Sequence, residues 1–204
     1  MPRIAEGRPP AVPTTVQQQE RCDRALAAAA RLGAAHGLEH VQMAQVAAEA
    51  DLALGTLYRY YPSKHHLFAG VLARNVQALR PAARRPGARP AEAVAAFMAS
   101  ACRSMLRSPR LARAMINSVN VVRSTTAVAP DTTMRDRILT VAGITDPDES
   151  DLRLARLVEQ CAYGVLTWAV AGESTAAEAE ADLRRACLLL CAPWGPVVEP
   201  AETS

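Results

Sequence analysis

The chain has 204 residues, of which 50% are apolar; that is enough to bury a core, yet no apolar run approaches the roughly 18 residues of a membrane-spanning helix. Its five cysteines form no Cys-x-x-Cys pair, which argues against a disulfide framework and indicates a reducing cytoplasm. The net charge of +3 is uneven: residues 1–89 carry twelve Lys and Arg against six Asp and Glu, whereas residues 90–204 carry eleven against fourteen. The front part alone is therefore expected to bind a polyanion.

Helices are expected throughout, because Ala and Leu dominate and Gly is sparse. Apolar residues recur at helical spacing, and Pro and Gly separate the segments. The clearest boundary is the stretch PAARRPGARP, which begins at Pro81. The sequence predicts an all-α fold with helices at 15–36, 42–50, 53–61, from Ser63 to about 80, and at 90–107, 110–127, 131–143, 150–172 and 176–191.

The second and third helices, with a three-residue turn between them, form a predicted helix-turn-helix. Ala47 stands where only a small side chain fits between the two helices, and Leu57 stands where the second helix must reach the core. The turn needs a left-handed backbone, and it holds Asp51, which tolerates that region better than most residues do. The second helix of such a unit lies in the major groove of DNA.

The stretch GTLYRYYPSK, residues 55–64, is then predicted to supply DNA contacts. Gly55 and its neighbour Thr56 are small and let the backbone approach DNA. Tyr58 and Tyr60 are predicted to be exposed arms whose hydroxyls reach phosphates or bases, whereas Tyr61 is predicted to face the core with Leu57. Lys64 would add a phosphate contact at the start of the next helix.

The segment VQMAQVAAEADLALGTLYRYYPSKHHLF resembles the DNA-binding segment of TetR-type transcriptional regulators, with a match over roughly residues 15–75. The resemblance implies an all-α homodimer that binds a double-stranded DNA operator, with a small ligand in a divergent C-terminal domain and the last two helices in the dimer bundle. The family's DNA contacts fall on Gln42, Ala44, Leu54, Gly55, Thr56, Tyr58, Tyr60 and Lys64.

Three positions depart from the commonest family pattern. Gln42 and Ala53 stand where Ser or Thr usually caps the two helices, and Leu54 stands where a polar or basic residue is frequent. Leu54 could instead touch a thymine methyl group. Binding would then rely more on the tyrosines, on Lys64 and on basic residues near the N-terminus: Arg3, Arg8 and Arg21.

The expected domains are a disordered basic arm at 1–14, a DNA-binding domain at 15–80, a ligand-binding and dimerisation domain at 81–192 and a flexible tail at 193–204. Within the family, the stretches VQM, PRLARAM and LTWAV look most like repressors of bacterial sterol and acyl-chain catabolism. That resemblance implies a bulky apolar effector, such as a steroid or a fatty acyl-CoA thioester.

The helices after residue 90 supply candidates for the effector pocket and the dimer interface. Methionines and polar-capable residues on apolar faces indicate a pocket of Met98, Cys102, Met105, Met115, Asn120, Tyr163 and Trp168. The dimer interface is expected at Trp168, Leu183, Cys187 and Leu190. No cofactor or metal is expected, because Gly37 ends the helix between His36 and His40, and the cysteines suit a core.

The sequence thus predicts a DNA-binding repressor that loses its inverted-repeat operator when ligand binds. An enzyme is disfavoured, because no nucleophile–base pair, phosphate loop or metal signature stands out. Three alternatives stay open: an activator, a regulator of a multidrug efflux pump, and a protein that binds any duplex without preference.

Overall fold

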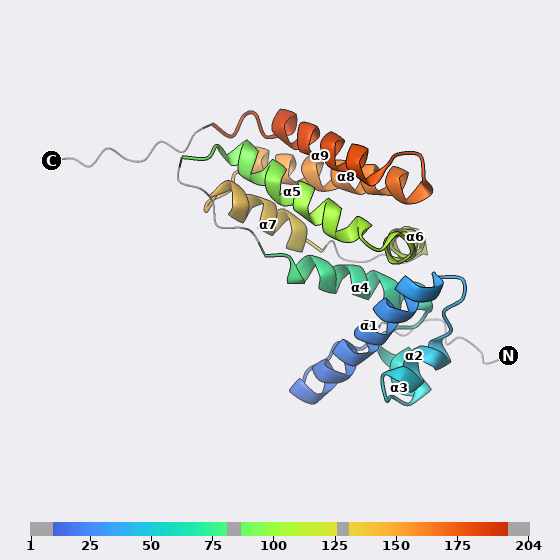
Figure 1. Ribbon diagram of the computed structural model, residues 1–204. Helices are drawn as coiled ribbons and strands as arrows, with labels where there is room; N and C mark the ends of the chain where they lie inside the picture. Colours follow the sequence, from blue (N-terminus) through green and yellow to red (C-terminus); the bar gives the residue numbers. More distant parts are fainter. Residues whose placement is uncertain (1–9, 81–86, 126–130, 196–204) are drawn as a thin grey trace. The chain divides into compact units, whose positions relative to one another are not determined.

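The computed structural model describes residues 10–80, 87–125 and 131–195 (Figure 1). In that part of the chain all regular structure is helical. The helix ends lie within two residues of their predicted places, except that the end predicted at residue 127 lies outside the described residues. The helices are α1 Val16–His36, α2 Met43–Glu49, α3 Leu54–Tyr60, α4 Lys64–Ala78, α5 Pro90–Leu106, α6 Pro109–Thr125, α7 Thr133–Ala142, α8 Glu149–Ala171 and α9 Ala176–Leu190. None of these helices is long and apolar enough to cross a bilayer.

The helices group into two compact units. The first unit holds the described residues up to 76 together with those from 108 to 125, and the second holds those from 77 to 107 and from 131 to 195. Helix α6 therefore belongs with α1, α2 and α3, although the sequence placed it beyond the boundary at residue 80. Helix α4 begins in the first unit and ends in the second.

Helix α1 is the centre of the first unit, where it packs against α2, α3 and α6. It starts at Thr15, whose side chain accepts a hydrogen bond from the Gln18 N–H at 3.2 Å. Its buried face includes Gly33, which is needed for a close approach: a Cβ there would lie 2.5 Å from Cε1 of the fully buried Phe68 on α4. This contact sets how near α4 can lie to α1.

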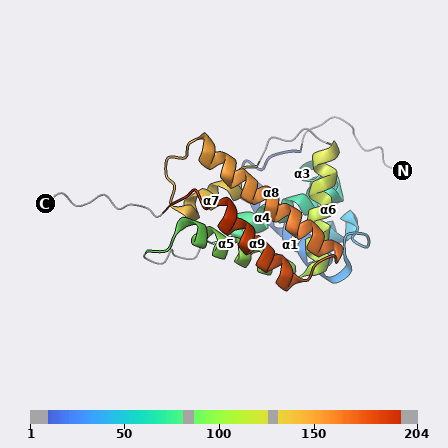
Figure 2. The same ribbon diagram turned by 90° about the horizontal axis from the view of Figure 1, so that it is seen from above.

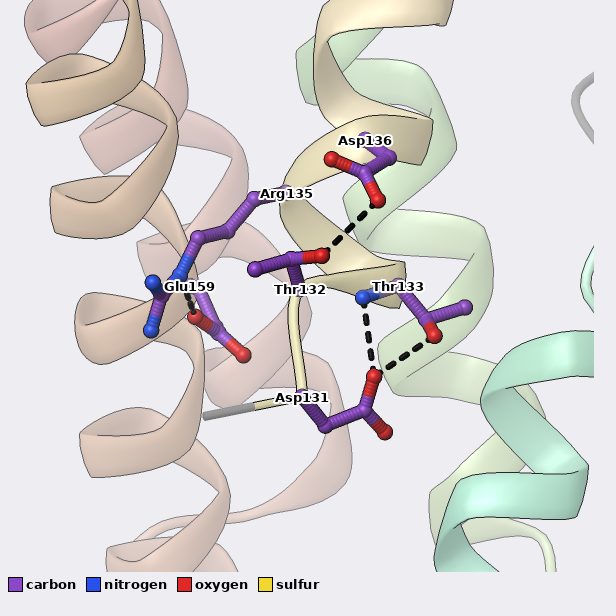
Figure 3. A network of polar contacts seen from close by, with 6 residues as sticks. All are labelled: Asp131, Thr132, Thr133, Arg135, Asp136 and Glu159. Carbon is purple, nitrogen blue, oxygen red and sulfur yellow. Dashed lines mark hydrogen bonds and ion pairs between the residues drawn. The ribbon is translucent and has the colours of Figure 1, made fainter. Parts of the chain in front are cut away.

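In the second unit, α5 packs against α7, α8 and α9, and α8 packs against both α7 and α9 (Figures 1 and 2). At the start of α7, Asp131 Oδ1 accepts from the Thr133 N–H and hydroxyl, and the Thr132 hydroxyl donates to Asp136 (Figure 3). One helical turn later, Arg135 Nε donates to Glu159 of α8 at 2.6 Å (Figure 3). Capping boxes at Asp148 and Thr175 start α8 and α9.

Both expected disordered ends need correction where the structure describes them. Trp194 is buried, and its Nε1 donates to Asp151 Oδ1 at 2.7 Å, so the core of the second unit extends past residue 192. At the other end, the Ala11 N–H donates to the Arg59 carbonyl at 3.0 Å. Residues 1–9 and 196–204 of the predicted arm and tail lie outside the described residues.

Gly33→Ala should lower the free energy of unfolding by about 1–3 kcal/mol, because the added methyl overlaps the buried Phe68 ring. Thermal unfolding followed by circular dichroism measures the change. Gly55→Ala is the matched control, since a Cβ there meets nothing within 4 Å, and it should leave stability unchanged or raise it. Equal stability of Gly33→Ala and the wild type would contradict this packing.

Candidate nucleic-acid interface

The turn between α2 and α3 has the geometry of a helix-turn-helix. Asp51 adopts a φ of 53°, and it is the one positive-φ residue other than glycine in the described part of the chain. The Leu52 N–H donates back to the Ala47 carbonyl at 2.9 Å and closes the turn. Ala47 and Leu57 are both buried, as the sequence predicts for the contact between the two helices and for the core plug.

The first turn of α3 faces away from this core. Gly55 is exposed and Leu54 is 41% exposed, so the backbone there is open to close approach by a ligand. Tyr58, one turn later, is 44% exposed, and Thr56 is half-buried. Gln42 and Ala44, at the start of α2, are exposed as well. A helix that presents its N-terminal residues in this way is suited to reading base edges in a major groove.

One of the tyrosine predictions is wrong. Tyr60 is buried at 7% exposure, because it lies three residues after Leu57 and shares its face. Tyr61 is half-buried and lies on the core side, as predicted: the chain leaves the helix there at φ −129°, and the ring lies against Gly70 of α4 and near the Cys22 thiol of α1. Burial raises the pKa of Tyr61 and of Cys22 above their usual values. Tyr58 is therefore the exposed arm of this segment.

Lys64 is held by the protein itself. Its Nζ donates to the Leu38 carbonyl at 3.0 Å, and the residue is half-buried. An ammonium group has three N–H donors, so others are available for a phosphate. Burial lowers the pKa of its neighbours His65 and His66, which favours their neutral forms at pH 7. Charge at the start of α4 therefore comes from Lys64.

The departures from the family pattern change how the helices are capped. At α2, the Gln42 N–H donates to Gln45 Oε1 at 3.1 Å, so Gln45 satisfies a backbone donor at this helix start. Ala53 offers no side-chain cap to α3. Of the basic residues named from the sequence, Arg21 is half-buried on α1, and Arg3 and Arg8 lie outside the described residues.

Comparison with known proteins agrees with this geometry. Residues 25–71 match the family of bacterial regulatory proteins of the tetR type, and residues 87–190 match the tetracyclin repressor-like C-terminal domain. The chain belongs to the TetR family of DNA-binding transcriptional regulators. The enzyme alternative is therefore dropped.

The similar proteins are transcriptional repressors and regulators. The HTH-type transcriptional repressor KstR of Rhodococcus jostii is 37% identical over 145 residues, which cover 69% of this chain and 68% of that protein. KstR of Mycobacterium tuberculosis is 40% identical over 101 residues, 48% of this chain and 46% of that protein. A solved TetR regulator from Rhodococcus is 39% identical, with a TM-score of 0.78 over 87% of this chain and 98% of that one.

A more distant structure shares the fold alone. FadR of Thermus thermophilus, a TetR-family repressor solved in complex with lauroyl-CoA, is 18% identical. Its TM-score is 0.58, over 90% of this chain and 98% of that one.

The residues predicted for the effector pocket of this TetR protein are divided between the two units. Met115 and Asn120 lie on α6 in the first unit, whereas Met98, Cys102, Met105, Tyr163 and Trp168 lie in the second. Met98 and Cys102 are buried on α5, but Trp168 is 61% exposed. Sequence spacing gave no sign that α6 packs with the N-terminal helices.

The predicted dimer residues need correction. Leu183 and Cys187 are fully buried within the protomer, on the α9 helix that packs against α5 and α8, so they offer no surface to a second copy. Leu190 is half-buried, and Trp168 is exposed. Burial raises the pKa of the Cys187 thiol to about 12, which makes it unreactive.

The structure also shows a cavity of about 560 Å³ in the first unit that the sequence did not predict. It lies where the end of α1 meets the start of α6, and its lining includes His36, His40, Arg110 and Arg113. Arg110 Nη1 donates to the Ala35 carbonyl at 2.8 Å across this junction. In the described residues no cluster of His, Cys, Asp and Glu could hold a metal ion.

Tyr58→Phe should weaken operator binding about three- to tenfold, the usual effect of losing one hydrogen bond to the partner. Tyr60→Phe is the matched control: its ring is buried, so operator affinity should stay within twofold of wild type, on the order of experimental error for a residue without contact. Fluorescence anisotropy with operator DNA measures both variants. A larger loss of operator affinity in Tyr60→Phe than in Tyr58→Phe would contradict this placement of the recognition surface.

Proposed function

We propose that this TetR-family regulator is a homodimeric repressor that occupies an inverted-repeat operator and leaves it when a bulky apolar ligand binds the second unit. The observation that carries the DNA-binding part is the exposed first turn of α3, directed by the left-handed Asp51. The similarity to KstR repressors supports repression of transcription and not activation. Because its target is chromosomal DNA, we place the protein in the cytoplasm.

The DNA contacts we propose are those that the surface allows. Leu54, Gly55 and Thr56 would lie in the major groove, with Tyr58 as a phosphate or base contact. Lys64 would contact a phosphate beside the first turn of α4. Gln42 and Ala44 would lie at the edge of the same surface, where α2 approaches the DNA backbone.

A second copy is proposed to cover an apolar face of α8 and α9. Leu157 and Trp168 are 39% and 61% exposed, and eleven residues, about three helical turns, separate them, so they share one face of α8. Leu189 of α9 is also 61% exposed, and α8 and α9 pack together. Pairing through this face would bury large apolar side chains that a monomer leaves in water.

Trp168→Glu should give a monomer with unchanged helix content, because a carboxylate would have to be buried in the proposed interface. Sedimentation velocity measures the state of association, and operator affinity should fall with it. Val121→Glu is the control: Val121 is an exposed apolar residue of α6, outside the proposed interface, and its replacement should leave the dimer intact. If the Trp168→Glu protein were still a dimer, this face would be excluded as the dimer interface.

The effector is proposed to be a steroid or a fatty acyl compound held in the second unit. The buried face of α5 supports this, because Met98 and Cys102 offer soft apolar surface that repacks readily around a bulky ligand. The resemblance to repressors of sterol and acyl-chain catabolism points to the same class. An efflux-pump regulator is the second candidate, since a broad apolar pocket would serve it equally.

The function is tested by selecting fragments of the source genome with purified protein at physiological salt. We expect an inverted repeat preferred at least about a thousandfold over other duplexes, as specific regulators show. Cognate ligand should then lower operator affinity about 5- to 150-fold. Equal retention of all fragments would support a protein that binds DNA without sequence preference. Efflux-pump genes next to the selected operator would support a regulator of a multidrug efflux pump.

A further inference from the structure

Arg137 of α7 caps the carboxyl end of α4. Its Nη1 donates to the Leu79 carbonyl at 2.6 Å, and its Nη2 donates to the Gln77 carbonyl. Arg80 Nη1 donates to the same Gln77 carbonyl at 3.1 Å. The last carbonyls of a helix have no partner within the helix and carry partial negative charge, so guanidinium groups stabilise them. Arg137 thereby fastens α7 to the end of α4.

The third nitrogen of this guanidinium has no partner. Arg137 Nε is buried, and no acceptor among the described residues lies within hydrogen-bond distance of it. Arg135, two residues earlier on the same helix, differs: its Nε is paired with the Glu159 carboxylate at 2.6 Å. Arg137 is half-buried, and no carboxylate in the described residues forms an ion pair with it. A buried N–H donor on a cation that lacks a carboxylate partner favours an anionic oxygen there.

We infer that Arg137 Nε is the polar contact of the effector site and receives a carboxylate at one end of an otherwise apolar ligand. This rests on the proposed function, and it narrows the ligand class from apolar molecules in general to apolar acids. A carboxylate on Nε would satisfy the unpaired donor and neutralise the guanidinium.

The surroundings of α7 can admit such a ligand. Helix α7 packs against α5 and α8, and α5 carries the methionines Met98 and Met105. Met134 precedes Arg137 by one turn of α7 and is half-buried. Methionine side chains are unbranched and polarizable, so they can rearrange around an apolar body with little strain. The acid end then meets Arg137, while the apolar body displaces these side chains.

The same residue also holds the last residues of α4 and the residue that follows it. Its Nη groups hold Gln77 and Leu79, which belong to the second unit, at the end of a helix that begins at Lys64 in the first unit. A carboxylate on Nε would therefore lie beside the end of α4, next to the two carbonyls that the Nη groups hold.

The test compares two matched pairs of probes: dodecanoate against dodecan-1-ol, and cholesteryl hemisuccinate against cholesterol. Binding is measured by tryptophan fluorescence of the full-length dimer, and release by operator anisotropy. The wild type should bind the acid of at least one pair about tenfold or more tightly than its neutral partner, the effect of one charged hydrogen bond. Arg137→Gln should abolish that preference while keeping the affinity for the neutral partner.

Two further variants separate this role from a structural one. Arg135→Gln removes a neighbouring guanidinium that already has a carboxylate partner, and it should keep the preference for the acid. Arg137→Lys keeps the charge and should restore part of the preference if Arg137→Gln is poorly folded. An undiminished preference in a folded Arg137→Gln protein overturns the inference and leaves the proposed function standing. Wild-type protein that binds neither pair refutes both the proposed ligand class and the inference.

Discussion

The left-handed backbone at Asp51 is the constraint on which the DNA-binding surface depends. It reverses the chain between α2 and α3 within a few residues, and the Leu52 N–H secures the reversal on the Ala47 carbonyl. The direction of α3 follows from it. Leu57 and Tyr60 then enter the core, and the opposite face, with Gly55 and Tyr58, is left to solvent. A different turn would rotate this short helix, so that Tyr58 would no longer be the tyrosine exposed to solvent.

The first unit is held together by a helix from the middle of the chain. Helix α6 packs on α1, and Ser118, fully buried on α6, forms a hydrogen bond of 3.3 Å with His65 of α4. The Asn75 amide of α4 also contacts the Met115 sulfur at 3.4 Å. Burial of a hydroxyl is tolerable only with such a partner, so Ser118 fixes the register of α6 against α4. The packing of α1 and α4 therefore depends on a helix that lies far beyond both of them in the sequence.

Local signals explain why the helices could be predicted from the sequence. Pro and Gly residues mark the helix ends, and apolar residues recur at 3.6-residue spacing. Asp51 stands at the turn between α2 and α3, which needs a left-handed backbone. Tyr60 was misassigned because it lies three residues after Leu57 and shares its buried face, whereas Tyr58 follows Leu57 directly and is exposed. Pro62 disfavours helical backbone at Tyr61, where the chain turns extended.

Non-local packing explains what could not be predicted. Leu183 and Cys187 have the spacing of an apolar helical face, and the sequence cannot say whether such a face meets another helix of the same protomer or a second copy. Trp194 looked like part of a frayed end because its partner, Asp151, lies 43 residues earlier. The membership of α6 in the first unit likewise depends on contacts across the sequence.

Helix α4 begins in the first unit and ends in the second, and a hydrogen bond from a basic side chain holds the chain at each of its ends. At its start, the Lys64 side chain donates to the Leu38 carbonyl within the first unit. At its end, the Gln77 and Leu79 carbonyls accept from Arg137 within the second. Both attachments join a side-chain cation to backbone carbonyls. Lys64 keeps N–H donors that a DNA phosphate could accept from, and Arg137 Nε is the donor that we propose for an acidic ligand. Each end of α4 therefore pairs one fixed contact within the protein with one donor that is open to an anion.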